Sequence, residues 1–164
     1  MVPLEFSEGS QAALKAARHL ARKRRADYIE VEHIALAVLD QAPASALLLA
    51  FGRAPDLERL REEIFAASGP VQPGLPMPVW DIPYSQAAVA VVRGALAAAE
   101  AFMSLTALPS KVGPGYLLIG VLCPVDESDR EPIKTHAAAA ILRSYGLDER
   151  LIADALSMFE PHVA

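Results

Sequence analysis

The sequence has a single cysteine, Cys123, among its 164 residues, which excludes an internal disulfide and a cysteine-based metal site. Cys123 ends an apolar run, and we expect a small buried side chain there. Aromatic residues are scarce at 6%, whereas 53% of the residues are hydrophobic, and alanine prevails among them. A sandwich or a barrel would need more Val, Thr and Tyr. The composition therefore favours a closely packed helical protein.

The sequence also predicts no membrane span and no targeting signal. No apolar stretch reaches the roughly 18 residues that a membrane span needs. The first ten residues, MVPLEFSEGS, lack the basic and then apolar regions of a signal peptide. The net charge is −5, and acids gather in the second half, as in DESDRE at 126–131, so no broad basic surface is available for nucleic acid. We expect a cytoplasmic protein that binds neither membranes nor nucleic acid.

Catalytic motifs are absent as well. The sequence contains no H-E-x-x-H, no G-x-S-x-G and no G-x-x-x-x-G-K-[ST] phosphate loop. A catalytic site needs a nucleophile with a base and an orienting group, or a set of metal ligands. The chain has four histidines, none of which lies in such a motif, and we expect them to be structural: His19, His33, His136 and His162. We predict no enzyme activity, no catalytic residue, no metal ligand and no cofactor.

Apolar residues at helical spacing predict four helices in the first half of the chain. The first begins at Ser7 or Ser10, either of which can cap it, and ends at the basic cluster 22–25. We interpret that cluster as cations that complement the helix dipole, with a phosphate-binding patch as the alternative. The later helices cover 31–41, then 43–52 with Gly52 as the terminating residue, and a segment that starts at Leu57.

The same pattern returns after a segment with five prolines, 68–85, which we interpret as a linker. SQAAVAVVRGALAAAEAF echoes SQAALKAARHLARKRR, GYLLIGVL echoes EHIALAVL, and both copies place an aromatic-glycine pair after the third helix. The predicted fold class is all-α, a tandem repeat of two four-helix units packed with pseudo-twofold symmetry. One domain is expected over 1–164, with repeat 1 at about 6–66, the linker at 67–83 and repeat 2 at about 84–159.

The start of the second helix, EVEHIALAVL, carries three ionisable residues in front of an apolar run: Glu30, Glu32 and His33. Catalysis, metal binding, ligand binding and ordinary helix-end chemistry could each place them there. A carboxylate such as Glu32 is favoured in a first helical turn by the dipole. His33 begins the buried face, and we expect it to be partly buried with its hydrogen bonds satisfied. Helix-start chemistry is the default interpretation, and ligand binding through Glu32 is the alternative.

Three groups of residues resemble the amino-terminal domain of the Clp/Hsp100 unfoldases. They are Phe6-Ser7-Glu8, then Glu32-His33 followed by Ile34, Leu36, Val38 and Leu39, and finally Phe51-Gly52. Because no phosphate loop is present, we expect a free-standing domain without ATPase modules, with a domain excised from a longer member of the family as the alternative. The resemblance implies a module that binds proteins or peptides, as an adaptor or a substrate-recognition component of Clp-type proteolysis. The alternative is a regulatory or decoy partner that self-associates or competes for Clp adaptors.

The resemblance further implies a phosphoarginine or peptide site in each repeat. In the first repeat the matching residues are Ser7 and Glu32, a hydroxyl for the phosphate and a carboxylate for the guanidinium. In the second repeat we take Pro83 and Gly115 as their equivalents, and these have neither a hydroxyl nor a carboxylate. The second site is therefore expected to be lost. Val31 stands where the family usually has a threonine, which removes an expected helix cap from the first site.

Overall fold

The computed structural model describes residues 4–41, 57–69, 82–106, 111–125, 137–148, 150–152 and 154. This part of the chain contains six helices and no strand beyond two isolated bridges. The helices are α1 (Glu8–Lys23), α2 (Val31–Leu39), α4 (Leu57–Ala67), α5 (Gln86–Thr106), α6 (Pro114–Leu122) and α7 (Ala137–Ser144). The all-α prediction is confirmed. The helix predicted at 43–52, most of the linker and the acidic stretch 126–131 lie outside the described residues, and the predicted domain limits stay a prediction.

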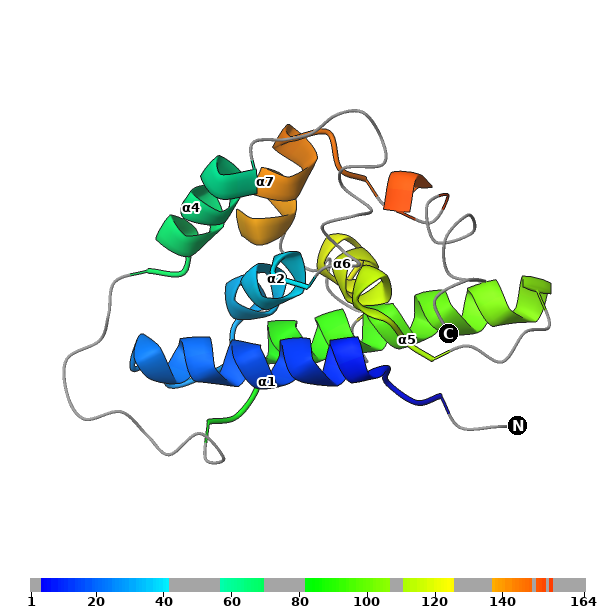
Figure 1. Ribbon diagram of the computed structural model, residues 1–164, viewed down its shortest axis with the longest axis horizontal. Helices are drawn as coiled ribbons and strands as arrows, with labels where there is room; N and C mark the ends of the chain where they lie inside the picture. Colours follow the sequence, from blue (N-terminus) through cyan, green and yellow to red (C-terminus); the bar gives the residue numbers. More distant parts are fainter. Residues whose placement is uncertain are drawn as a thin grey trace.

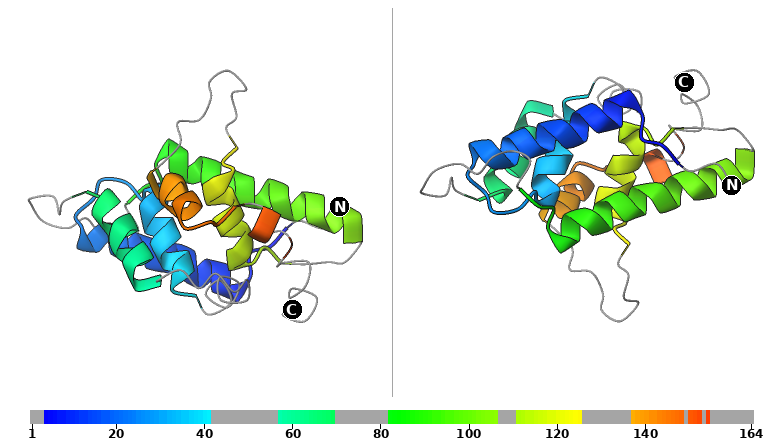
Figure 2. Two further views of the ribbon diagram at one scale, coloured as in Figure 1. Left: turned by 90° about the horizontal axis from the view of Figure 1, so that it is seen from above. Right: turned by 90° about the horizontal axis from the view of Figure 1, so that it is seen from below.

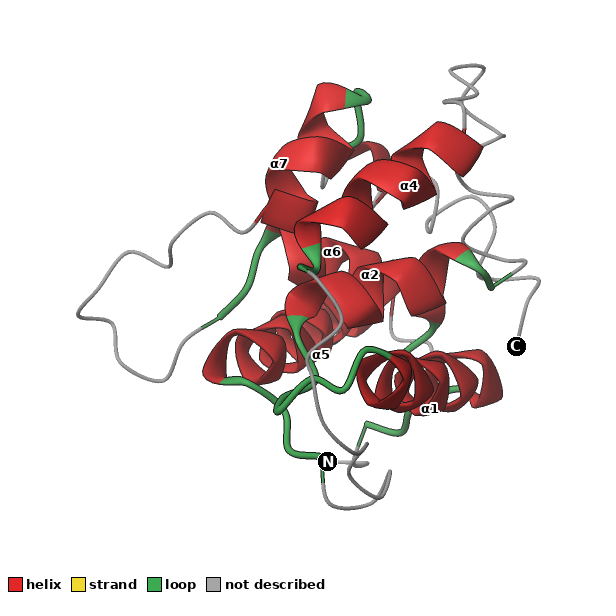
Figure 3. Ribbon diagram, turned by 90° about the vertical axis from the view of Figure 1, so that its left-hand side faces the viewer, coloured by secondary structure: helices red, strands yellow, loops and turns green. Residues whose placement is uncertain are grey.

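The two most apolar helices, α2 and α6, form the centre of the molecule. Every residue of α6 is buried, and so is every residue of α2 except Glu32. In Figures 1 and 3, α1 and α5 lie on one side of this pair, while α4 and α7 lie on the other. Figure 2 shows from below how α1 and α5 together cover their side of the pair. Corresponding helices of the two repeats thus occupy matching places, as the tandem-repeat prediction requires.

The first helix of each repeat begins at a serine cap. Ser7 precedes α1 and its hydroxyl accepts a hydrogen bond from the Ser10 amide at 3.2 Å. Ser85 precedes α5, and its hydroxyl accepts a bond from the Ala88 amide at 3.1 Å. These bonds satisfy one of the amides that every helix start leaves without a partner. Of the two caps that the sequence allowed for α1, the structure uses Ser7.

Two glycines allow α5 and α6 to approach closely. A Cβ atom on Gly120 would lie 2.1 Å from the Val91 carbonyl oxygen, and one on Gly94 would lie 2.4 Å from the Cys123 carbonyl oxygen. Real Cβ atoms essentially never come so near to a backbone oxygen. The backbones therefore touch at a contact that any larger residue would separate.

Among the described residues, α5 contains one stretch, Gln86–Ser104, that is long and apolar enough to cross a membrane by length and composition. We had expected no such stretch, and that expectation was wrong because only Arg93 and Glu100 interrupt it. A third of the stretch is buried inside the protein. Its buried residues face α6 and the rest of the core, which accounts for part of the apolar composition.

Arginines from other helices donate hydrogen bonds to the carboxyl-terminal carbonyl groups of α2 and α6. An Arg61 guanidinium nitrogen on α4 donates to the Leu39 carbonyl at 3.0 Å, and Arg61 also pairs with Asp40 at 3.1 Å. On α7, Arg143 donates to the Leu122 carbonyl at 2.9 Å. A cation at a helix carboxyl end complements the dipole and satisfies a carbonyl that lacks a helical partner.

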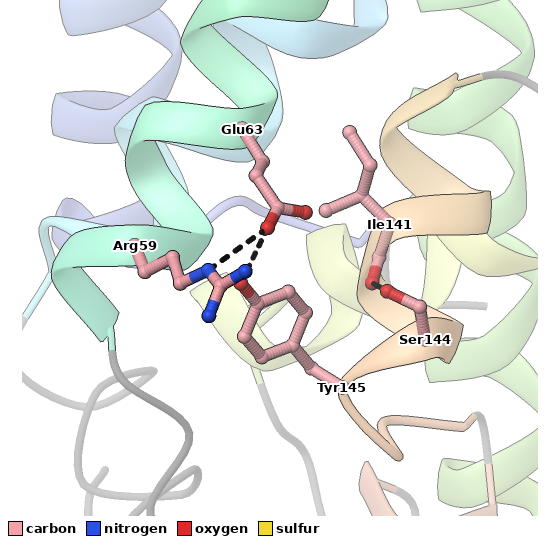
Figure 4. A network of polar contacts seen from close by, with 5 residues as sticks. All are labelled: Arg59, Glu63, Ile141, Ser144 and Tyr145. Carbon is pink, nitrogen blue, oxygen red and sulfur yellow. Dashed lines mark hydrogen bonds and ion pairs between the residues drawn. The ribbon is translucent and has the colours of Figure 1, made fainter.

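The aromatic-glycine pair after α7 has the predicted form, because Gly146 has a φ of 83° and ends the helix in the left-handed conformation. The Tyr145 hydroxyl donates to Glu63 Oε1 at 2.8 Å, and Arg59 pairs with the same carboxylate oxygen at 3.4 Å. Figure 4 shows this contact between α7 and α4, which joins the second repeat to the first.

Cys123 is exposed, so its predicted burial is wrong. It is the C-cap residue of α6, with a φ of −129° and a ψ of 68°. The apolar run ends with Leu122, and the backbone leaves the helix direction at Cys123. The Cys123 side chain therefore lies outside the core.

A candidate ligand-binding site at the helix starts

The start of α1 is hydrogen bonded to the segment in front of α6. The Ser7 amide donates to the Val112 carbonyl at 3.0 Å, and the Val112 amide donates to the Glu5 carbonyl at 2.8 Å. The buried Ser10 hydroxyl donates to the same Val112 carbonyl at 2.6 Å. Phe6 and Val112 thereby form a parallel bridge between the two repeats.

The start of α5 is joined to the segment in front of α2 by the same pattern. The Ile29 amide donates to the Pro83 carbonyl at 2.8 Å, and the Ser85 amide donates to the Ile29 carbonyl at 3.1 Å. Ile29 and Tyr84 form the second parallel bridge. The two bridges are related by the pseudo-twofold axis. In each, the residue before the first helix of one repeat pairs with the segment before the central helix of the other repeat.

The matching bonds establish which residues correspond between the repeats. Ser7 corresponds to Ser85, since each caps the first helix of its repeat and each amide donates to the bridge residue of the other repeat. Our assignment of Pro83 to this place was wrong by two residues, so the second repeat does keep a hydroxyl. Glu32 and Gly115 are the second residues of α2 and α6, so that assignment stands, and the second repeat has no carboxylate there.

The bridges also decide which serine neighbours which central helix. Ser85 is bonded to Ile29, two residues before α2, and Ser7 is bonded to Val112, two residues before α6. The hydroxyl near the start of α2 is therefore the one from the second repeat. The structure places the two predicted site residues at different helix starts, Glu32 with Ser85 and Ser7 with Gly115. The predicted roles of Ser7 and Glu32 in ligand binding stay predictions.

The start of α2 is fixed by His33 and Glu30. Glu30 is the N-cap residue, and its amide donates to Nδ1 of His33 at 3.0 Å. His33, the third residue of the helix, thus completes a capping box. His33 is 1% exposed, which corrects the expected partial burial, and within the described residues its Nε2 has no hydrogen-bond partner. Because Nδ1 accepts, the neutral ring carries its proton on Nε2. This arrangement answers why a histidine follows Glu32: it organises the helix start.

Charge near His33 comes from Arg24. Burial, and to a smaller extent the nearby Arg24 cation, together lower the pKa of His33 to about 4. Arg24 is 8% exposed, and its guanidinium lies 4.1 Å from the centre of the half-exposed Phe65 ring. His33 is therefore neutral at physiological pH. It can orient the start of α2, but it offers no charge to a ligand.

Chemically, each helix start offers first-turn amides and a serine hydroxyl, which suit an anion. At the second position of the two central helices, α2 has a carboxylate on the partly exposed Glu32, whereas α6 has Gly115. Across the described residues, no three His, Cys, Asp or Glu side chains gather as a metal site would require. The candidate site is thus one where an acceptor for a cation lies near donors for an anion, and sequence reasoning missed Ser85 in it.

A family model described as the Clp repeat (R) N-terminal domain matches residues 5–122 of this chain. The chain belongs to this Clp N-terminal domain family. The N-terminal domain of the caseinolytic protease associated chaperone ClpD from Arabidopsis thaliana has a similar structure, with a TM-score of 0.61, 17% identity and coverage of 94% of this chain and 93% of that one. A structure from preliminary investigations of a malarial protein secretion system gives a TM-score of 0.71 and 20% identity, covering 96% and 97%. A search of curated proteins found no match.

Proposed function

We propose that this Clp N-terminal domain is a protein- or peptide-binding module that serves Clp-type proteolysis in the cytoplasm as an adaptor or substrate-recognition component. The proposed function is binding without catalysis. Family membership supports the Clp connection. The observation that carries the binding proposal is the crossed arrangement of helix starts, which brings the α5 cap Ser85 beside the start of α2, where Glu32 lies.

Phosphoarginine is the ligand that the family resemblance suggests, and the chemistry of this place suits it. The guanidinium would bind the Glu32 carboxylate, and the phosphate would bind the first-turn amides of α5 and the Ser85 hydroxyl. The equivalent place near Ser7 has the hydroxyl and the amides of α1 but has Gly115 in place of a carboxylate. We therefore expect one ligand per chain, bound at the start of α2.

Affinity capture from a cell lysate, read by mass spectrometry, tests the proposed function. The wild-type protein should retain Clp unfoldase components, adaptors or arginine-phosphorylated substrates. Glu32→Ala should lose the phosphorylated substrates, because it removes the carboxylate that would pair with the guanidinium. Gly115→Ala serves as the matched change at the other helix start and should leave capture unaltered. Recovery of nothing but further copies of this chain would contradict the adaptor role.

A further inference from the structure

A stripe of cations runs along one face of α1, and we call it the α1 basic stripe: Lys15, Arg18 and Arg22. Residues three and four apart lie on the same side of a helix, so these three side chains are neighbours. Lys15 and Arg22 are exposed, and Arg18 is partly exposed. The stripe is therefore open to solvent along its length.

The stripe has no acidic partner within the part of the chain that the structure describes. Neither the Arg59–Glu63 pair within α4 nor the Arg61–Asp40 pair between α4 and the end of α2 involves α1. The single acid of α1 is Glu8, in its first turn, whereas residues 8–25 hold six Lys or Arg residues. Complementing the dipole accounts for cations in the last turn, such as Arg22, but not for Lys15 and Arg18 further up the helix. A chain with a net charge of −5 thus carries a concentrated positive surface with which no acid forms an ion pair in the part of the chain that the structure describes.

Arg18 connects this surface to the candidate site. Its guanidinium carbon lies 5.4 Å from the centre of the Tyr84 ring, and Tyr84 directly precedes Ser85. An arginine that stacks on a ring uses its flat face, so its N–H groups remain directed outward in the plane. Arg18 thereby packs against the residue that directly precedes the Ser85 cap. Arg18 is the middle cation of the stripe, with Lys15 and Arg22 on either side of it along α1.

We propose that the α1 basic stripe binds acidic side chains of a peptide segment from a partner protein, next to the residue that occupies the helix-start site. This inference rests on the proposed function and adds to it the charge of the bound segment. Neighbouring cations on the stripe are about 5–6 Å apart, and alternate side chains of an extended peptide repeat at about 6.5–7 Å. Carboxylates on alternate residues can therefore meet successive cations. A long polyanion such as nucleic acid would also meet the acidic remainder of the chain, which disfavours it.

Fluorescence anisotropy with a labelled synthetic peptide tests the proposal on the intact chain. The probe is a 12-residue peptide that alternates Asp with Ser, and the same peptide with Asn for Asp is the neutral reference. We expect saturable binding of the Asp peptide alone, and weaker binding as ionic strength rises from about 0.05 M to about 0.5 M. Arg22→Glu should weaken binding by roughly three- to tenfold, because attraction becomes repulsion at an exposed pair. Arg18→Lys keeps the charge but loses the ring-stacked geometry, and a smaller loss is expected.

The matched control is Arg150→Glu, which makes the same charge change at another exposed position. It should leave the affinity for the Asp peptide within about twofold of the wild type, since distant exposed charges are screened. Equal losses from Arg22→Glu and Arg150→Glu would overturn the proposal, as would tighter binding of a 12-residue oligothymidylate than of the Asp peptide. Glu32→Ala should not weaken the binding of the Asp peptide, because Glu32 belongs to the helix-start site and not to the α1 basic stripe. Failure of the helix-start site and failure of the stripe are thus separable.

Discussion

At the residue scale, the stretch that leads into α2 illustrates how much local chemistry the sequence reveals. The interpretation of Glu30 and His33 as helix-start groups is confirmed by their capping box, in which the Glu30 amide donates to His33. The depth of burial could not be predicted, because it depends on α4 and on Arg24, which approach from other parts of the sequence. Ser85 was missed for a similar reason. The proline-rich linker hides the register between the repeats, and only the Ile29 bridge fixes it.

The lowered pKa of His33 predicts a loss of stability in acid. The folded state holds His33 neutral down to about pH 4, whereas the unfolded chain binds a proton near pH 6.5. The contribution of His33 is thus fully present above pH 6.5 and is lost as pH falls toward 4, by about 3 kcal/mol in total. Urea unfolding at several pH values measures this change.

A matched variant isolates the histidine from the carboxylates that also titrate in acid. His33→Gln keeps a side chain that can accept the Glu30 amide bond in a capping box but cannot titrate. Its free energy of unfolding should fall less between pH 6.5 and pH 4.5 than that of the wild type. Parallel curves for the two proteins would mean that His33 titrates normally in the folded state.

At the element scale, the contact between α5 and α6 depends on glycines at the crossing. The helical pattern predicted both helices, but nothing in the local sequence states that Gly94 and Gly120 face one another. A glycine inside a helix usually weakens it by about 1 kcal/mol relative to alanine. Here that cost is offset, because the bare backbones can touch at a distance that no Cβ permits. The tertiary contact, and not helix propensity, explains these two residues.

We predict that Gly120→Ala destabilises the protein, although alanine is the better helix former. The new methyl group would meet the Val91 carbonyl oxygen, so the helices must separate, at a cost of about 1–3 kcal/mol or more. Thermal unfolding followed by circular dichroism measures the change. The exposed Ala97→Leu on α5 is the control for added volume and should have little effect. A Gly120→Ala protein as stable as the wild type would show that the crossing tolerates a wider spacing.

At the scale of the whole molecule, the tandem repeat predicted the fold, because each unit repeats the same apolar pattern and neither unit has enough surface to bury alone. The sequence could not show that the serine cap of each repeat's first helix lies beside the start of the other repeat's central helix. The family resemblance assigned Ser7 and Glu32 to one site within one repeat. The bridges Phe6–Val112 and Ile29–Tyr84 instead join the start of each repeat's first helix to the segment in front of the other repeat's central helix.

This crossed arrangement is the central claim, and titration with free phosphoarginine followed by amide NMR shifts tests it most directly. We predict one equivalent bound, with shifts at the starts of α2 and α5. Glu32→Ala should weaken binding by about one to two decades, and Ser85→Ala by a smaller factor, since a neutral hydroxyl is a weaker partner than a carboxylate. Ser7→Ala, the matched change at the other cap, should leave the affinity unaltered. A loss with Ser7→Ala but not with Ser85→Ala, or shifts gathered around Gly115, would contradict the account.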